Sequence, residues 1–482
     1  MTTRVSLGSF AAILLLAAGC GPPSPSAGPS GSGGSPQAPA SGVSDVSLVI
    51  ANGIVVTMDG AERILSPGSV AVRDDVIVAV DSPGAIDAAY RGRERIDATG
   101  HLVLPGLINT HTHAPMVMYR GLADDLALME WLEKYIFPAE AKTVSPEFVR
   151  VGTRLAALEM IRSGTTLYAD MYYFEEEIAA ETRAAGLRGV LGQTIIQFPV
   201  PDAKTPAAGL ERAEVFITRF KNDPLITPAV APHSMYTLDQ ATLLAARDLA
   251  VKHGVPLLVH LAETQDEVKI AGERYQRRPA TFLDGIKFWA PVTLAAHGIW
   301  VSPDEVAMLA SRGVAVSHNP ESNMKLASGA APVPAYLKAG VKLGLGTDGA
   351  ASNNDLDMFE AMRQAAFLHK LVSNDPRVVS AREALRMATI GGARALGMDQ
   401  RLGSLEPNKL ADVIVVRTDR PRQTPMYDPI SHLVYATHGD DVVTTIVNGR
   451  VLMRDSEVRT LDESQVLKDA RSAAEQVRKA VQ

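Results

Sequence analysis

The chain has 482 residues, 46% of them hydrophobic, which is ample for a large buried core. Its formal net charge is −7 and it contains no basic block, so nucleic acid is not an expected partner. A single cysteine excludes a disulfide framework and a cysteine-rich metal site.

Residues 1–20 have the pattern of a secretory leader. Arg4 precedes an apolar run at residues 10–18, which is too short to span a bilayer and is typical of a signal peptide. The following LLLAAGC resembles a bacterial lipoprotein signal, in which the cysteine becomes the lipidated first residue of the mature chain. An ordinary signal peptide with a coincidental cysteine is the alternative. We therefore expect lipidation at Cys20 and a location in the cell envelope, on the periplasmic or surface side of a bacterial membrane.

Residues 21–44 contain only Gly, Pro, Ser, Ala, Gln and Val. This composition cannot bury an apolar face, so it predicts a disordered linker. A Gly/Ser-like chain of this length spans roughly 25–30 Å on average. The linker would tether the rest of the chain to the membrane, and we expect no other membrane contact.

Residues 45–101 show short β-rich runs separated by turns. One example is the pair of runs at 47–50 and 54–57, which flank the turn sequence Asn52-Gly53. Residues 401–482 repeat the pattern, with a second such turn at Asn448-Gly449. Two β-rich segments on either side of a long middle predict a small β-sandwich domain formed from both termini.

The last residues of the chain, 463–482, predict a closing helix for that C-terminal part. Apolar residues recur there at helical spacing: Val466, Ala470, Ala473, Val477 and Val481.

Residues 102–400 alternate apolar strand-like runs with helical stretches. Such an alternation predicts a parallel (β/α)₈ TIM-type barrel, whose active site lies at the C-terminal ends of the strands. The eight predicted strands are 102–108, 165–169, 189–196, 226–231, 256–259, 292–296, 314–317 and 341–345.

Polar residues lie at or near the C-terminal ends of these strands. In strand order they are His111, His113, Asp170, Gln193, His233, His260, His297, His318 and Asp348. Six of the eleven histidines of the chain belong to this set, which favours a functional site over ordinary core histidines.

A metal site is predicted from the ligand types at these positions. His111 and His113 are two residues apart and share one face of a strand. Together with His260 and Asp348 they offer three nitrogens and one carboxylate, which suits Zn²⁺ first and Fe²⁺ as the alternative. A second metal would need a bridging group such as a modified lysine, and the fourth run, 225–232, contains none. We therefore expect one divalent metal.

Three residues beside this metal are the predicted catalytic groups. A bound metal of this kind lowers the pKa of its water to about 7. Glu263 lies three residues after His260 and could carry protons between that water and a substrate. His297 and Asp348 could hold and deprotonate the water. Glu263 and Asp348 would then face the substrate as well.

Taken together, the motifs of the middle segment resemble the amidohydrolase superfamily, most closely the 5-methylthioadenosine/S-adenosylhomocysteine deaminases. The resemblance covers roughly residues 47–455 and is carried by PGLINTHTHAPM, APHSMY, VHLAET, TLAAHGIW, VSHNPESNMKLASG and LGTDGAASNNDLDMF. It implies the same metal ligands and proton carriers. It also implies hydrolytic deamination of an adenine nucleoside (5′-methylthioadenosine, S-adenosylhomocysteine, adenosine or 5′-deoxyadenosine) to the inosine-type product and ammonia.

The resemblance further implies a set of substrate contacts. Trp131 and Glu140, in EWLEKYIFPAE, match a tryptophan and a glutamate that family members use on the loop after the first strand. Glu140 could accept hydrogen bonds from both ribose hydroxyls, and Trp131 could cover an apolar 5′ substituent. His233 could donate to the base, and Ser352 lies where the family contacts the 5′ side. For His318 we expect a substrate or supporting role, with a hydrogen-bonded strand cap as the alternative.

One departure from the family concerns the arginines that hold the homocysteine carboxylate in some members. Gln193 ends the third strand, and the KTPAAG loop at 204–209 has no arginine. We therefore expect the smaller nucleosides to be preferred over S-adenosylhomocysteine. The alternatives are a related hydrolase of another aminated heterocycle, of guanine or triazine type, and a non-catalytic nucleoside-binding lipoprotein. The sequence leaves a homo-oligomer open.

Overall fold

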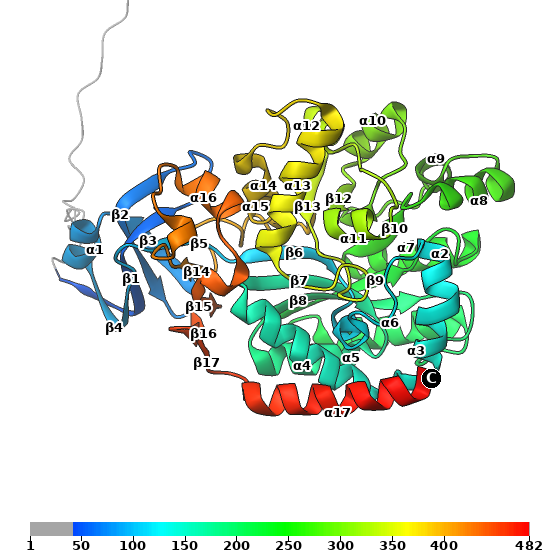
Figure 1. Ribbon diagram of the computed structural model, residues 1–482, viewed down its shortest axis with the longest axis horizontal. Coiled ribbons are helices and arrows are strands. Elements are labelled where there is room, and N and C mark those ends of the chain that lie inside the picture. The colour runs from blue at the N-terminus through cyan, green and yellow to red at the C-terminus, as the bar shows by residue number, and fades with distance from the viewer. Residues whose placement is uncertain (1–41, 482) are drawn as a thin grey trace, which may run out of the picture. The chain divides into compact units, whose positions relative to one another are not determined.

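The computed structural model describes residues 42–481, whose helices and strands are labelled in Figure 1. Cys20, the predicted leader and almost all of the predicted linker lie outside the described residues. Within 42–481, no helix is both long enough and apolar enough to cross a membrane.

A closed barrel of eight parallel strands forms the centre of the described part. The strands are β6 (Leu107–Thr112), β7 (Thr165–Tyr172), β8 (Arg188–Ile195), β9 (Ile226–Pro232), β10 (Leu257–Leu261), β11 (Thr293–His297), β12 (Ala315–His318) and β13 (Lys342–Leu345). The last strand pairs with the first, with Leu345 opposite Asn109, and this closes the barrel. The predicted (β/α)₈ fold is confirmed. Almost every strand residue is buried, as expected where helices cover a parallel sheet.

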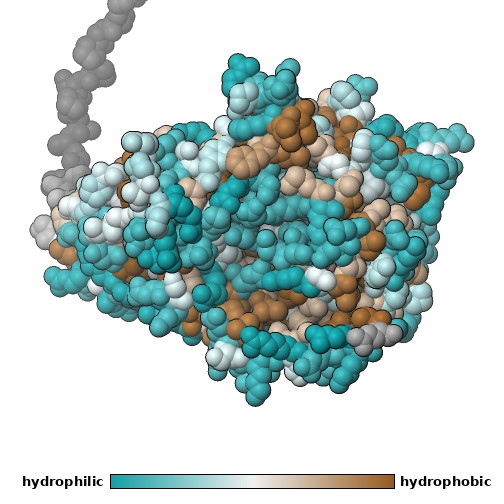
Figure 2. Space-filling model, in the orientation of Figure 1, coloured by the Kyte–Doolittle hydropathy of each residue, from teal (hydrophilic) through white to brown (hydrophobic). Residues whose placement is uncertain are grey.

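Helices connect the strands and surround the barrel (Figure 1). They are α4 (Pro146–Arg162), α5 (Glu175–Ala185), α6 (Pro206–Phe220), α7 (Gln240–His253), α8 (Gln265–Tyr275), α9 (Pro279–Gly285), α10 (Pro303–Arg312), α11 (Pro320–Lys325), α12 (Val333–Ala339), α13 (Met358–Ser373), α14 (Ala381–Met387) and α15 (Ile390–Ala395). Helix α10 shows how local sequence sets their ends. Ser302 and Glu305 form a capping box at its start, and Gly313, with φ 69°, ends it. Most of the face shown in Figure 2 is hydrophilic, so the helices turn polar sides outward there.

The connection between β6 and α4 is unusually long. It contains η1 (Ala114–Tyr119), α2 (Leu128–Trp131), the π-helical turn η2 (Leu132–Ile136) and α3 (Phe137–Thr143). Both Trp131 and Glu140 belong to this connection.

Both ends of the described chain build a nine-stranded sheet, which agrees with the predicted small β-sandwich. Its strands are β1 (Ser44–Val56), β2 (Ile64–Arg73), β3 (Val76–Asp81), β4 (Tyr90–Asp97), β5 (Leu102–Pro105), β14 (Val413–Val416), β15 (Val442–Val447), β16 (Arg450–Arg454) and β17 (Glu457–Val458). The N-terminal and C-terminal parts meet where β5 pairs with β14 in antiparallel fashion. Buried apolar residues such as Ile50, Val72, Val103 and Val413 form its core. Two further helices are α1 (Pro83–Ala89) and α16 (Pro429–Tyr435), and the short turns η3 (Pro421–Gln423) and η4 (Gly439–Asp441) complete the C-terminal part.

The first predicted strand, 102–108, is two strands in the structure. Residues Leu102–Pro105 belong to the sheet as β5, and the barrel begins at Leu107. Gly106 lies between them, and its N–H donates to the carbonyl of Asp412 at 3.0 Å. A Cβ at this position would lie 2.2 Å from the side chain of Thr166. The predicted boundary at residue 102 was therefore one short strand too early.

The C-terminal helix α17 (Glu463–Val481) forms where the apolar spacing predicts it. It packs along the barrel helices α4 and α3 (Figure 1). Val466, Ala470 and Val477 are buried against them. Polar contacts support both ends of the helix: Arg162 pairs with Glu463 at 2.8 Å, and the Lys142 ammonium donates to the carbonyl of Ala480 at 2.9 Å.

Candidate active site

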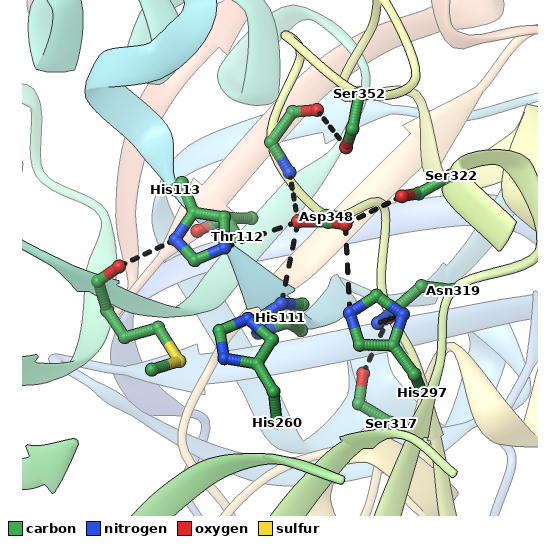
Figure 3. Close-up of polar contacts among 12 residues, drawn as sticks. His111, Thr112, His113, His260, His297, Ser317, Asn319, Ser322, Asp348 and Ser352 are labelled. Atoms are coloured by element: carbon green, nitrogen blue, oxygen red, sulfur yellow. Dashed lines mark hydrogen bonds and ion pairs between the residues drawn. The ribbon is translucent and has the colours of Figure 1, made fainter. Parts of the chain in front are cut away.

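The four predicted metal ligands converge at the C-terminal ends of the barrel strands (Figure 3). His111 belongs to β6, His113 directly follows it, His260 belongs to β10 and Asp348 follows β13. Asp348 Oδ1 lies 3.5 Å from His111 Nε2 and 3.3 Å from His113 Nε2. The ligand atoms of these three residues lie within 4.8 Å of one another, as do those of His111, His260 and His297.

Backbone carbonyls orient two of the imidazoles. His113 Nδ1 lies 2.6 Å from the carbonyl oxygen of Met171, and His260 Nδ1 lies 2.8 Å from that of His233. Because a carbonyl can only accept, each Nδ1 carries the proton and each Nε2 keeps a free lone pair. His111 Nε2 is buried without a hydrogen-bond partner among the described residues. A buried nitrogen of this kind calls for a bound group. Three imidazole nitrogens and a carboxylate thus fit a divalent metal.

Asp348 is fixed by two donors and by an uncommon backbone conformation. Ser322 Oγ donates to its Oδ2 and the Gly349 N–H to its Oδ1, both at 2.7 Å. Its φ is 64°, and His297, at the end of β11, has φ 71°. Non-glycine residues in this left-handed region cost on the order of 1–3 kcal/mol each, and such strain concentrates at functional sites.

The predicted proton carriers lie next to the ligand cluster. His297 Nε2 is 3.8 Å from Glu263 Oε2 and 3.8 Å from Asp348 Oδ2, and its Nδ1 lies 2.8 Å from Asn323 Oδ1. Burial lowers the pKa of His297, but the carboxylates of Glu263 and Asp348 outweigh burial and raise that pKa overall. Burial raises the pKa of Glu263. A carboxyl group and an imidazole that lie side by side, each with a raised pKa, are suited to proton transfer.

A hollow of about 620 Å³ opens beside these groups. It brings together most of the predicted substrate contacts, which come from separate parts of the chain: Trp131, Glu140, His233, Glu263, Asp348 and Ser352. Trp131 and Glu140 reach it from α2 and α3, whereas the others follow barrel strands. The structure therefore places six of the seven predicted substrate residues around one cavity.

His318 is the exception, because the structure places it away from the lining of this hollow. Its side chain is fully buried and is not among the residues that line the hollow. Its Nε2 lies 3.0 Å from Nε2 of His369 on α13. The preceding residue, Ser317, faces the barrel interior, where its hydroxyl contacts that of Thr110 at 2.6 Å. Because strand side chains alternate, His318 must point outward toward the helices.

Two other strand-end residues hold loops rather than line the hollow. Asp170 accepts hydrogen bonds from Thr112 Oγ1 at 2.7 Å and from the Ala114 N–H at 2.5 Å, and so braces the chain on either side of His113. Gln193 donates to Asp202 at 2.8 Å.

Sequence reasoning missed several residues of the site. Tyr172, Tyr173 and Tyr236 line the hollow, and Ser322 and Asn323 support Asp348 and His297. A signal existed for some of them: Ser322 and Asn323 belong to the motif VSHNPESNMKLASG, and Tyr172 comes three residues after the predicted second strand, 165–169.

Comparison with known proteins agrees with this geometry. The model of the amidohydrolase family matches residues 102–452. A 5-methylthioadenosine/S-adenosylhomocysteine deaminase of Syntrophobacter fumaroxidans is 47% identical over 437 residues, which are 91% of this chain and 100% of the relative. A 5′-deoxyadenosine deaminase of Methanosarcina mazei is 43% identical over 89% of this chain and 98% of its own. The crystal structure of a zinc-bound adenosine deaminase from Xanthomonas campestris has a TM-score of 0.89 at 38% identity and covers 91% of this chain and 100% of that one.

Proposed function

Because the chain belongs to the amidohydrolase family, we propose that it hydrolyses the 6-amino group of adenine nucleosides, giving an inosine-type product and ammonia. One observation carries this proposal. A single hollow joins the metal-ligand cluster and Glu263 to a buried carboxylate, Glu140, on a separate helix. The first set suits hydrolysis and the second suits a ribose diol, which free bases and triazines lack. The deaminase relatives support the same reading.

The metal that we propose is a single Zn²⁺, held by His111, His113, His260 and Asp348. The ligand types favour it, and the related adenosine deaminase was solved with bound zinc. When bound, such a metal supplies a water that is activated at neutral pH.

The residues of the chain then divide the proton transfers. Glu263 gives a proton to a ring nitrogen of the purine while the water oxygen adds to the neighbouring carbon. His297 and Asp348 take the proton that this water loses. The amino group takes up that proton and leaves as ammonia as the carbon–nitrogen bond breaks. The new hydroxyl becomes the carbonyl of the product and returns its proton to Glu263, which restores the acid. Glu263 and His297 are both buried, so these transfers take place away from bulk water.

His233 is placed to recognise the base. Burial lowers its pKa to about 3, so its imidazole is neutral and keeps a single N–H. Its Nδ1 lies 3.2 Å from the hydroxyls of Ser234 and Thr237, which can donate to it. The remaining Nε2–H would then be free to donate to a ring nitrogen of the purine.

The lining of the hollow favours nucleosides with a small or apolar 5′ group. Among the described residues that line it, none is an arginine or a lysine, and several are apolar, including Leu128, Trp131, Leu132 and Phe137. A homocysteine carboxylate would find no cation in this lining.

We expect 5′-methylthioadenosine, 5′-deoxyadenosine and adenosine to have higher kcat/KM values than S-adenosylhomocysteine. The measurement is ammonia release from each compound, and from guanine and a triazine, on one zinc-loaded preparation. A preference for S-adenosylhomocysteine would overturn the inference that the hollow favours a small or apolar 5′ group, but not the proposed nucleoside deamination. Turnover of free bases or triazines only would defeat the nucleoside proposal, and nucleoside binding without any turnover would favour the non-catalytic alternative.

We also propose that the protein is lipid-anchored through Cys20, on the support of the leader-like sequence alone. Lipoprotein processing would supply the two or more acyl chains that stable anchoring needs. The mature chain is expected to begin at an acylated Cys20 and to fractionate with membranes, as mass spectrometry of the N-terminal peptide can show. A Cys20→Ser variant should lose the acyl mass. A soluble mature protein that begins at another residue would contradict the anchor. Removal of residues 1–44 should leave turnover intact, because no proposed site residue lies there.

A further inference from the structure

A hydrogen bond connects the barrel to the helix that carries Glu140. The hydroxyl of Tyr172, the last residue of β7, donates to Glu140 Oε1 at 2.7 Å, across 32 residues of sequence. Tyr172 is 3% exposed and Glu140 5% exposed, and both line the hollow. Among the described residues, no other group donates a hydrogen bond to this carboxylate.

We propose that Tyr172 is a positioning residue for ribose recognition: its hydroxyl holds one oxygen of Glu140 so that the carboxylate presents its other oxygen to the 2′ and 3′ hydroxyls. This inference rests on the proposed nucleoside deamination. An ionised carboxylate has about four acceptor positions, so one bond to Tyr172 leaves enough capacity for a vicinal diol.

The backbone of Tyr172 is held in place by the hydrogen bonds of strand β7. Tyr172 lies opposite Gln193 of β8, and its N–H donates to Glu175 at 2.8 Å. The preceding residue, Met171, holds His113 through its carbonyl. Two adjacent residues of one strand thus orient a metal ligand and the diol acceptor, which relates the reacting end of a nucleoside to its ribose.

The helix α3 has little of its own to orient Glu140. It is seven residues long, follows the π-helical turn η2, and its N-cap residue, Ile136, provides no side-chain cap. A short helix without capping leaves the direction of a carboxylate to tertiary contacts. The bond from Tyr172 is such a contact.

The charge state of Glu140 depends on the same bond. The titratable groups around it are Tyr119 of η1, Tyr172 of β7 and Tyr173, which follows β7, and the pKa of each is raised by burial, so all three are neutral. Burial raises the pKa of Glu140 to about 7, and the Tyr172 hydroxyl opposes this rise. Without that hydroxyl the carboxyl would keep its proton to a higher pH. Protonation turns one acceptor oxygen into a donor, so diol binding weakens as the pH falls.

The test compares Tyr172→Phe with the unchanged enzyme on adenosine and on 2′,3′-dideoxyadenosine, which has no diol. We expect KM for adenosine to rise roughly 10-fold, as for a lost hydrogen bond to a charged group, with kcat within about threefold of the unchanged enzyme. KM for the dideoxy compound should stay the same. The KM of the unchanged enzyme for adenosine should rise as the pH falls through about 7, and in the variant this rise should begin at higher pH.

Tyr168→Phe is the matched control. Tyr168 belongs to the same strand and is fully buried, but its hydroxyl contacts Thr182 of α5 and does not line the hollow. Both kinetic constants of this variant should be unchanged.

Equal KM increases for the two nucleosides, or a loss confined to kcat, would overturn the role of Tyr172. A second variant keeps the inference testable if Tyr172→Phe is poorly folded. Glu140→Ala leaves Tyr172 in place and removes the acceptor, so it should show the same selective loss on adenosine and no change on the dideoxy compound. Where Tyr172→Phe folds, adding it to Glu140→Ala should cost little more, because the contact is already gone. Failure of the unchanged enzyme to deaminate any nucleoside would instead defeat the proposed function.

Discussion

Replacing Glu263 by glutamine is expected to lower kcat by roughly 10²–10⁴-fold while the metal stays bound, as for the removal of a general acid or base. Glu263 is buried, and its Oε2 lies 3.8 Å from His297 Nε2. Burial raises its pKa, so this carboxyl favours the protonated form that a general acid needs. An amide has nearly the same shape but has no acidic proton to give.

Steady-state ammonia release and elemental analysis of the same preparation check this expectation. The backbone N–H of Glu263 donates to Glu267 at 2.9 Å, a contact that the glutamine variant keeps, so the loop should hold its position. Glu273→Gln is a suitable control, because Glu273 is exposed on α8 and lines no part of the hollow. Near-normal turnover of Glu263→Gln would assign the proton transfer to another group.

Replacing His111 by alanine is expected to abolish both metal binding and turnover. His111 Nε2 is buried, has no hydrogen-bond partner among the described residues, and lies 3.5 Å from Asp348 Oδ1. Alanine leaves two imidazoles and one carboxylate of the proposed set. The His111 ring lies between the other ligands, 4.9 Å from the ring of His113 and 5.0 Å from that of His260, so its loss leaves a gap at the centre of the set. Because zinc binding depends on ligand geometry as well as ligand number, the remaining three groups should not hold the metal productively.

Metal content gives a readout that does not depend on activity. Elemental analysis should find about one metal per chain in the unchanged protein and almost none in His111→Ala. His253→Ala is the matched control: this imidazole is partly exposed on α7 and contacts Glu214 at 3.2 Å, so both metal and turnover should persist. Two metals per chain, or an active protein without metal, would contradict the single-metal site.

The barrel and most of its candidate site could be predicted because both depend on local sequence patterns: apolar runs, helical stretches and the residue types at strand ends. Apolar runs of strand length alternate with helical stretches, and such a pattern has few solutions other than a parallel barrel. Once the strands are placed, the fold brings their C-terminal ends together, so His111, His260, His297 and Asp348 must converge although they are far apart along the chain. Residue type then indicates candidate metal ligands and candidate proton carriers.

Side-chain direction at the strand ends could not be predicted as well. Side chains along a strand alternate between the inner and the outer face, so an error of one residue in the position of a strand reverses the direction of every side chain. Short apolar runs do not show at which residue a strand ends. His318 illustrates this, because it ends β12 as His297 ends β11, yet it points toward His369. The backbone conformation of His297 and Asp348, with φ of 71° and 64°, also has no local signal in the sequence.

The local pattern of the chain thus specified the strands, the helices, the ligand types and the family resemblance, because each depends on neighbouring residues or on a short motif. Contacts between distant segments were settled only by folding. Helix α17 has an apolar face that could cover any apolar surface, and the groove beside α4 and α3 is the one it buries. The bond between Tyr172 and Glu140 likewise depends on how α3 lies over the end of β7. The local sequence shows that an apolar helix face must be buried and that a buried hydroxyl must form a hydrogen bond. It does not show which distant residues are the partners, because these depend on the packing of the whole chain.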